Sequence, residues 1–198
     1  MASRPPLAWA GALAASAMLL AAMAFVLRLF RPAVYASAPA LGLLVGLFAI
    51  VIVAAAVGAR VQPGAPELVP LALLGVVVSA LFDRRMSVVV VLCGAALIAA
   101  QPVYRGATAL PVLLVAGGAA ALVVRPTAQR DQSYIWMLVI TVATSLMLAA
   151  ASSAARIGLD ELLMSVARCA GVAIASVIVA MLLMPFAERA TGRETHLT

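Results

Sequence analysis

Residues 68–100 read LVPLALLGVVVSALFDRRMSVVVVLCGAALIAA, which is two apolar runs joined by Asp83, Arg84 and Arg85. One continuous membrane helix would place these three charges near the bilayer centre, at roughly 2.5 to 3.5 kcal/mol for each charge. A helix break that leaves the charges among the lipid headgroups avoids this cost. The stretch therefore predicts two short helices in a tight hairpin, with Asp83, Arg84 and Arg85 at the cytoplasmic surface.

The rest of the 198-residue chain repeats this alternation of apolar stretches and short charged or proline-bearing breaks. Hydrophobic residues make up 66% and charged residues 10%, whereas soluble domains are roughly half apolar and a quarter charged. The composition therefore predicts an all-α integral membrane protein, a polytopic bundle of about seven transmembrane helices in a single domain over 1–198. The expected helices lie at about 7–27, 39–59, 68–82, 86–100, 109–124, 134–151 and 161–184, followed by a polar cytoplasmic tail at 185–198.

The lengths of the apolar stretches divide them into two groups. A helix needs about 20 residues to cross ~30 Å of hydrocarbon, although flanking residues or a thinner bilayer can serve shorter spans. The first, second, sixth and seventh stretches meet this length, and the third to fifth are short. The first stretch, Leu7–Leu27, also exceeds the usual 7 to 15 residues of a signal-peptide core, so we predict a retained membrane helix.

The distribution of arginine predicts the orientation. The chain has 13 basic residues, all arginine, and a net charge of +6. Under the positive-inside rule the larger share favours the N-terminus outside and the C-terminus in the cytoplasm of a bacterial inner membrane. The bilayer is then the expected partner, and nucleic acid is not expected because no soluble module carries a basic face. The cytoplasmic share is Arg28, Arg31, Arg84, Arg85, Arg125, Arg130, Arg189 and Arg193, against Arg4, Arg60, Arg105 and Arg156 outside.

The sequence contains no recognisable catalytic or metal-binding constellation. Cys93 and Cys169 lie in apolar stretches, where free cysteine behaves as a small hydrophobic residue. The single histidine, His196, lies in the polar tail, and no His, Cys, Asp or Glu cluster has metal-ligand spacing. Glycine-rich phosphate loops and Gly-x-Ser-x-Gly elbows are also missing from the sequence. We therefore predict no enzyme activity, no cofactor and no metal in this chain.

Arg168 is the one charge well inside an expected span. An intramembrane charge is by default a candidate functional residue, but Arg168 is also close enough to the outer headgroups to reach them by snorkelling. Both a structural role and a coupling role therefore stay open. Glu161 is the best-placed partner in sequence, at i, i+7 on the same helix face, with Asp160 and Glu67 as alternatives.

Small residues recur at the four-residue spacing that lets membrane helices approach closely. We expect these rows to pack within the bundle. We also expect Thr141, Thr144 and Ser145 to bond to carbonyls of their own helix rather than to line a substrate path. The small-residue rows are Gly11 with Ala15, Gly42 with Gly46, and Ala167 with Gly171 and Ala175.

Several short segments follow one another in an informative order. They are Leu27–Pro32 (LRLFRP), Leu68–Pro70 with Leu81–Val88, the break Val124–Asp131, and Met184–Arg189 with Glu194–Thr198. Taken together they resemble the membrane region of the seven-transmembrane receptors with an intracellular HD hydrolase domain, a family that includes bacterial cyclic-di-AMP phosphodiesterases.

The resemblance implies a large extracytoplasmic domain before the helices and a metal-dependent HD phosphohydrolase after them. Neither lies within these 198 residues, so none of the family's catalytic His and Asp residues can be assigned here. The leading hypothesis is a noncatalytic membrane anchor and signal-transmitting bundle of the HD-hydrolase receptor type, with a homo-oligomer or a larger membrane complex as its assembly. Such a bundle works through helix shifts between two packings of similar free energy.

Two other functions stay open. One is a small membrane transport or substrate-binding subunit, in which Arg168 and the Gly117-Gly118 pair surround a cavity near the membrane middle. The other is a structural subunit of a larger membrane complex, bound laterally through the small-residue faces.

Overall fold

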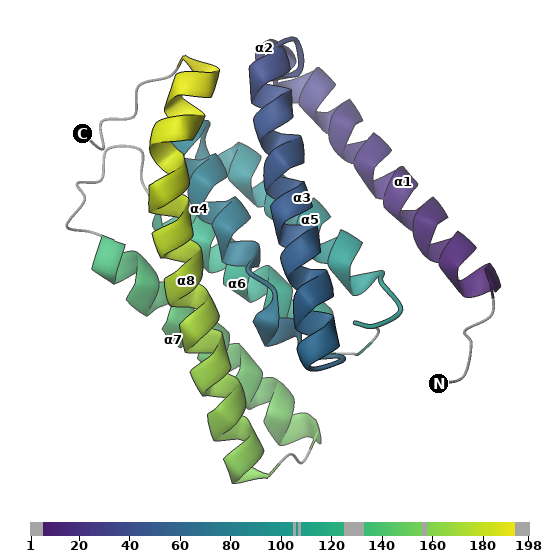
Figure 1. The fold of residues 1–198 in the computed structure, drawn as a ribbon, viewed down its shortest axis with the longest axis vertical. Helices are drawn as coiled ribbons and strands as arrows, with labels where there is room; N and C mark the ends of the chain where they lie inside the picture. The colour runs from purple at the N-terminus through teal and green to yellow at the C-terminus, as the bar shows by residue number, and fades with distance from the viewer. Residues whose placement is uncertain (1–5, 105, 107, 125–132, 156–157, 193–198) are drawn as a thin grey trace.

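The computed structural model describes residues 6–104, 106, 108–124, 133–155 and 158–192, and these residues form helices joined by short turns (Figure 1). The all-α class predicted from the sequence is confirmed. The elements are α1 (Pro6–Phe30), α2 (Pro32–Tyr35), α3 (Ala38–Val61), the 3-10 helix η1 (Pro66–Leu68), α4 (Leu71–Leu81), α5 (Arg84–Ala99), α6 (Ala109–Val123), α7 (Ser133–Ala155) and α8 (Leu159–Thr191).

Each of the seven expected apolar stretches contains a helix, and the short α2 and η1 are additions that the sequence pattern did not indicate. The expected start of a polar tail at residue 185 was wrong, because α8 continues through Pro185 to Thr191. Met184 and Ala187 are both buried, so packing against the bundle continues past the proline and holds the helix together. The helix ends at Gly192, whose φ of 62° is the left-handed conformation common at helix C-termini.

Helix length separates an outer set from an inner set. By length and composition, four helices can cross a membrane: Leu13–Phe30 of α1, all of α3, Ser133–Ala151 of α7 and Leu159–Arg189 of α8. The 11 residues of α4 rise only about 16 Å, roughly half of a ~30 Å hydrocarbon core. All of these residues are buried, so α4 is surrounded by protein and need not match the thickness of the lipid.

The core is built around α4. This helix packs against α5, α6 and α8, and α3 lies with α8 in front of it in Figure 1. Gly75 makes the tightest approach, since a Cβ built there would lie 2.7 Å from both the Gly117 carbonyl oxygen and the Ala120 Cβ. The Ser87 hydroxyl donates to the Gly75 carbonyl at 2.8 Å, so this contact also satisfies a polar group in the dry core.

The small-residue rows expected to pack within the bundle do not do so. A Cβ at Gly11, Gly42, Gly46 or Gly171 would meet no neighbouring atom within 4 Å. The glycines at close helix contacts are instead Gly75, Gly94 and Gly117, which do not belong to those rows. Four-residue spacing marks a face that permits close approach, but the apolar residues with the largest burial decide which face turns inward. The expectation for Thr144 is confirmed, because its hydroxyl bonds the Ile140 carbonyl of the same helix. For Ser145 the expectation was wrong, because its buried hydroxyl bonds no carbonyl of the helix.

Polar contacts between helix ends lie at two opposite ends of the bundle. At one end, an Arg31–Asp83 ion pair joins the α1–α2 junction to the α4–α5 turn, and Arg84 Nη2 donates at 2.8 Å to the Leu122 carbonyl near the end of α6. We call this the Asp83 end. At the other, an ion pair joins η1 to α8, and Tyr104 after α5 bonds to α3. We call this the Glu67 end. Successive long helices thus alternate in direction, with α1 rising and α3 descending in Figure 1.

Candidate functional site

The Glu67 end contains a buried ion pair. Glu67 lies in η1, between α3 and α4, and its side chain is 5% exposed. Its Oε1 lies 3.9 Å from Nη1 of Arg168 on α8, whose side chain is 34% exposed. This distance exceeds the 2.7 to 3.2 Å of a direct N–H···O bond, so the two groups attract as charges without a formed hydrogen bond. The pair links the segment before the central helix to α8.

Arg168 pairs with Glu67, one of the two alternative partners named from the sequence, and not with Glu161, which was expected first. No ion pair joins Glu161 to Arg168 among the described residues, and Glu161 is exposed. Residues at i and i+7 are separated by about 10 Å along a helix, so a shared face does not bring their charged groups together. Glu67 is about a hundred residues away in sequence, and η1 folds it against α8. Only its position in a break on the same predicted side of the membrane pointed to this pairing.

An open pocket lies beside the ion pair. It has a volume of about 210 Å³, and Glu67 and Glu161 both line it, together with Ser165 from the first turns of α8. Glu67 and Glu161 thus line the same pocket, although only Glu67 pairs with Arg168. The remaining lining comes from the α3–η1 loop and the start of η1, from the residue before α6, and from α7: Gln62, Pro63, Gly64, Ala65 and Pro66, then Thr108, then Leu148 and Ala151.

A smaller cavity adjoins this pocket, and Pro66 and Glu67 line both. It measures about 10 Å³ and is bordered by Glu67, Thr144 and Cys169 among apolar neighbours such as Ile140. A cavity needs about 10 to 15 Å³ to hold a water molecule, so this one approaches the size of a single water. Gly117 packs tightly against Val91 of α5, so it does not border a substrate cavity as the transport hypothesis expects.

Tyr104 fixes the loop after α5 to α3 at this end. Its hydroxyl donates to the Ala55 carbonyl at 2.6 Å, and the residue is 4% exposed. Burial raises the pKa of Tyr104, and the negative charge of Glu67 raises that pKa further. The tyrosine therefore stays neutral as a hydrogen-bond donor at physiological pH.

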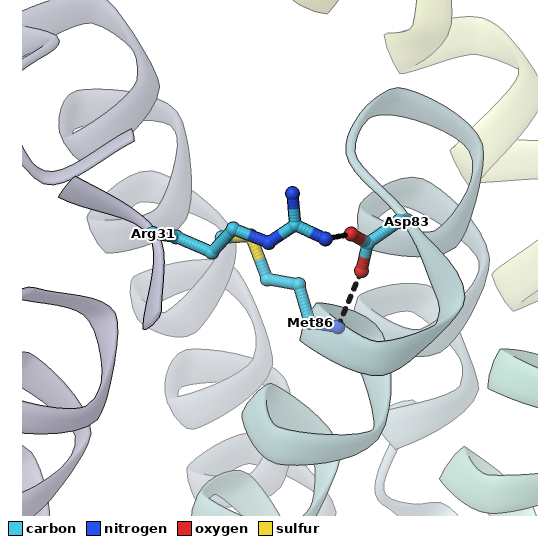
Figure 2. A network of polar contacts seen from close by, with 3 residues as sticks. All are labelled: Arg31, Asp83 and Met86. Carbon is cyan, nitrogen blue, oxygen red and sulfur yellow. Dashed lines mark hydrogen bonds and ion pairs between the residues drawn. The ribbon is translucent and has the colours of Figure 1, made fainter. Parts of the chain in front are cut away.

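The Asp83 end is organised by the hairpin turn (Figure 2). Asp83 is the N-cap of α5, and its Oδ1 accepts a 2.7 Å hydrogen bond from the Met86 amide. Its other carboxylate oxygen pairs with Arg31. An N-cap of this kind is worth about 0.5 to 2 kcal/mol, whereas a half-exposed ion pair contributes at most about 1 kcal/mol. The break between α4 and α5 predicted from the sequence is confirmed, and the cap is its main local cause.

In the part of the chain that the structure describes, no group of three or more His, Cys, Asp or Glu side chains is placed to hold a metal ion. Cys93 and Cys169 are both free thiols, as the sequence indicated.

These features define a multi-pass helical membrane domain with a packed core and two polar ends. The chain matches the family model described as "7TM receptor with intracellular HD hydrolase" over residues 6–195. It therefore belongs to this family, as its membrane domain, and the resemblance seen in the sequence is confirmed. No match was found among the curated proteins or the solved structures.

Proposed function

We propose that this domain is a noncatalytic anchor and signal-transmitting bundle, in which a change at the Glu67 end alters the position of α8 at the Asp83 end. The observation that carries the proposal is the Glu67–Arg168 pair, because it ties α8 to the segment that leads into the buried central helix. At 3.9 Å the two groups attract as charges without a direct hydrogen bond, so the contact is not fixed in one hydrogen-bonded geometry.

The length of α8 supports this role. Its 33 residues rise about 50 Å, so one helix carries Arg168 at the Glu67 end and Arg189 at the other end. Helix shifts of ~1 to 2 Å are one of the recurrent motions in allosteric transitions. A family with an intracellular hydrolase would receive such a shift at the C-terminal end of this helix.

The proposed orientation places the Asp83 end in the cytoplasm of a bacterial inner membrane. Among the described residues, this end carries Arg28, Arg31, Arg84, Arg85 and Arg189, whereas Arg60 and Arg168 lie toward the Glu67 end. The positive-inside rule then puts the Glu67 pocket outside, where a stimulus can reach it.

Glu67→Gln is expected to move α8 at the Asp83 end. The change removes the charge that holds Arg168, so α8 should shift relative to α3 by about 1 to 2 Å. The distance between spin labels at Val45 on α3 and Phe186 on α8, which are both exposed, reports this shift. It is measured by pulsed electron–electron double resonance in a Cys93→Ala, Cys169→Ala background.

Glu161→Gln is the matched control, since it removes a carboxylate from the same pocket without touching the ion pair. This variant should keep the wild-type distance distribution. Identical distributions in Glu67→Gln and wild type would contradict the coupling role and leave Arg168 as a structural residue.

A structural subunit of a larger assembly is the second candidate, favoured by the small-residue rows that the bundle leaves on its surface. Gly42 and Gly46 on α3 and Ala167 and Gly171 on α8 are all exposed. Small residues permit close approach of helices from another chain in the membrane. This role and signal transmission are compatible, since the exposed small-residue rows and the Glu67–Arg168 pair are different parts of the bundle.

A further inference from the structure

A crevice separates α1 from the rest of the bundle at the Asp83 end. The main contacts of α1 are with α5 and α2, and Figure 1 shows it leaning away from the other long helices. The crevice has a volume of about 460 Å³, which falls within the ~300 to 1,000 Å³ of typical ligand sites. Its walls are apolar side chains with two arginines, namely Val26, Leu27, Phe30, Arg31, Arg85, Met86 and Val89.

The arginines around this crevice are not equivalent. Arg31 pairs with Asp83, and Arg84 donates to the Leu122 carbonyl. Arg85 is exposed, and it forms no ion pair within the described part of the chain. The crevice therefore combines a long apolar wall with one guanidinium whose charge is not balanced by a carboxylate.

We propose that this crevice binds an anionic glycerophospholipid, with the phosphate on Arg85 and an acyl chain along Phe30 and Val89. Guanidinium groups bind phosphate through paired, charge-assisted hydrogen bonds. Arg31 can contribute a second contact while it keeps its ion pair with Asp83. The apolar wall runs from the arginines toward the middle of the membrane, because Val26 precedes Arg31 on α1 and Val89 follows Arg85 on α5.

The charge at the crevice favours a lipid over a second copy of the chain. A helix from another copy would fill the apolar wall, but it would need a carboxylate at the depth of Arg85 to balance the charge. An anionic lipid supplies both parts in one molecule and is already present at the headgroup level. Basic crevices between membrane helices are a recurrent type of site for anionic headgroups.

The test measures binding of dioleoylphosphatidylglycerol and dioleoylphosphatidylcholine to the purified full chain in a neutral detergent, by native mass spectrometry. Phosphatidylglycerol should bind more tightly than phosphatidylcholine. Arg85→Gln should weaken phosphatidylglycerol binding about fivefold, which is the effect of about 1 kcal/mol for one basic residue near a membrane surface. Arg85→Lys keeps the charge and should retain most of the affinity.

Arg28→Gln is the matched control, because it removes the same charge at the same end of α1 but does not line the crevice. This variant should change the affinity less than about twofold, because solvent and salt screen a charge that lies outside the crevice. An equal loss in Arg28→Gln and Arg85→Gln would overturn the proposal in favour of general surface attraction. Equal binding of the two lipids would also overturn it. A disulfide that forms in the membrane between Phe30→Cys of one copy and Val89→Cys of another would overturn it too, because a second copy would then occupy the crevice.

Discussion

Gly75→Leu is expected to be the most damaging single substitution in the core, with a loss of more than ~3 kcal/mol of unfolding free energy. Even the first carbon of a side chain would lie 2.7 Å from the Gly117 backbone oxygen, and backbone cannot rotate away as a flexible side chain can. Overpacking a dense core costs about 1 to 3 kcal/mol for added methylenes, and leucine adds several atoms beyond the Cβ. The measurement is reversible unfolding in mixed detergent micelles.

Gly46→Leu provides the control for helix propensity. A Cβ at Gly46 meets open space, and both glycines lie inside helices, so the gain of about 1 kcal/mol from replacing glycine applies to both. We expect Gly46→Leu to be as stable as the wild type or slightly more stable. Equal stability of the two variants would show that α4 and α6 do not meet at Gly75.

Arg168→Gln and Glu67→Gln should have unequal effects on stability. Arg168→Gln leaves a carboxylate that is 5% exposed without its cation, and breaking a buried pair in this way costs ~3 to 5 kcal/mol. The partial exposure of Arg168 places the expected loss near the lower figure. Glu67→Gln leaves an arginine that is 34% exposed and can reach the headgroups by snorkelling, so we expect about 1 kcal/mol or less.

The double variant separates pairing from snorkelling. If the charges interact, Arg168→Gln in the Glu67→Gln background should cost much less than it does alone. Thermal unfolding of the four proteins gives this coupling energy. Additive losses, or a wild-type melting temperature for Arg168→Gln, would mean that Arg168 only snorkels and would remove it from the candidate site.

The sequence predicted the helices well because burial in a membrane imposes long apolar runs with charges at their ends. The hairpin at Asp83 is the best example, since three adjacent charges in the middle of an otherwise largely apolar stretch at 68–100 permit few other arrangements. The end of α8 was missed because Pro185 followed by charged residues resembles a helix stop. Tertiary packing of Ala187 carries the helix past that point.

The partner of Arg168 and the packing glycines depend on how the helices meet, which local spacing does not encode. Glu67 lies in a break that resembles any other, and only the fold of η1 brings it to α8. Gly75, Gly94 and Gly117 stand on three different helices and share no local motif. The rows that did have a motif are exposed because the face of a helix that turns inward is set by its larger side chains.

The central claim is that the helices cross the membrane seven times, with the Glu67 end outside and the Asp83 end in the cytoplasm. Single cysteines at Gln62, Arg84 and Gly158, in a background without Cys93 and Cys169, test it most directly with a membrane-impermeant maleimide on bacterial spheroplasts. Gln62→Cys and Gly158→Cys should be labelled on intact spheroplasts, and Arg84→Cys only after permeabilisation. Labelling of Arg84→Cys from the same side as Gln62→Cys would contradict the account, because the chain from η1 through α4 to the hairpin turn would then not pass from one surface to the other.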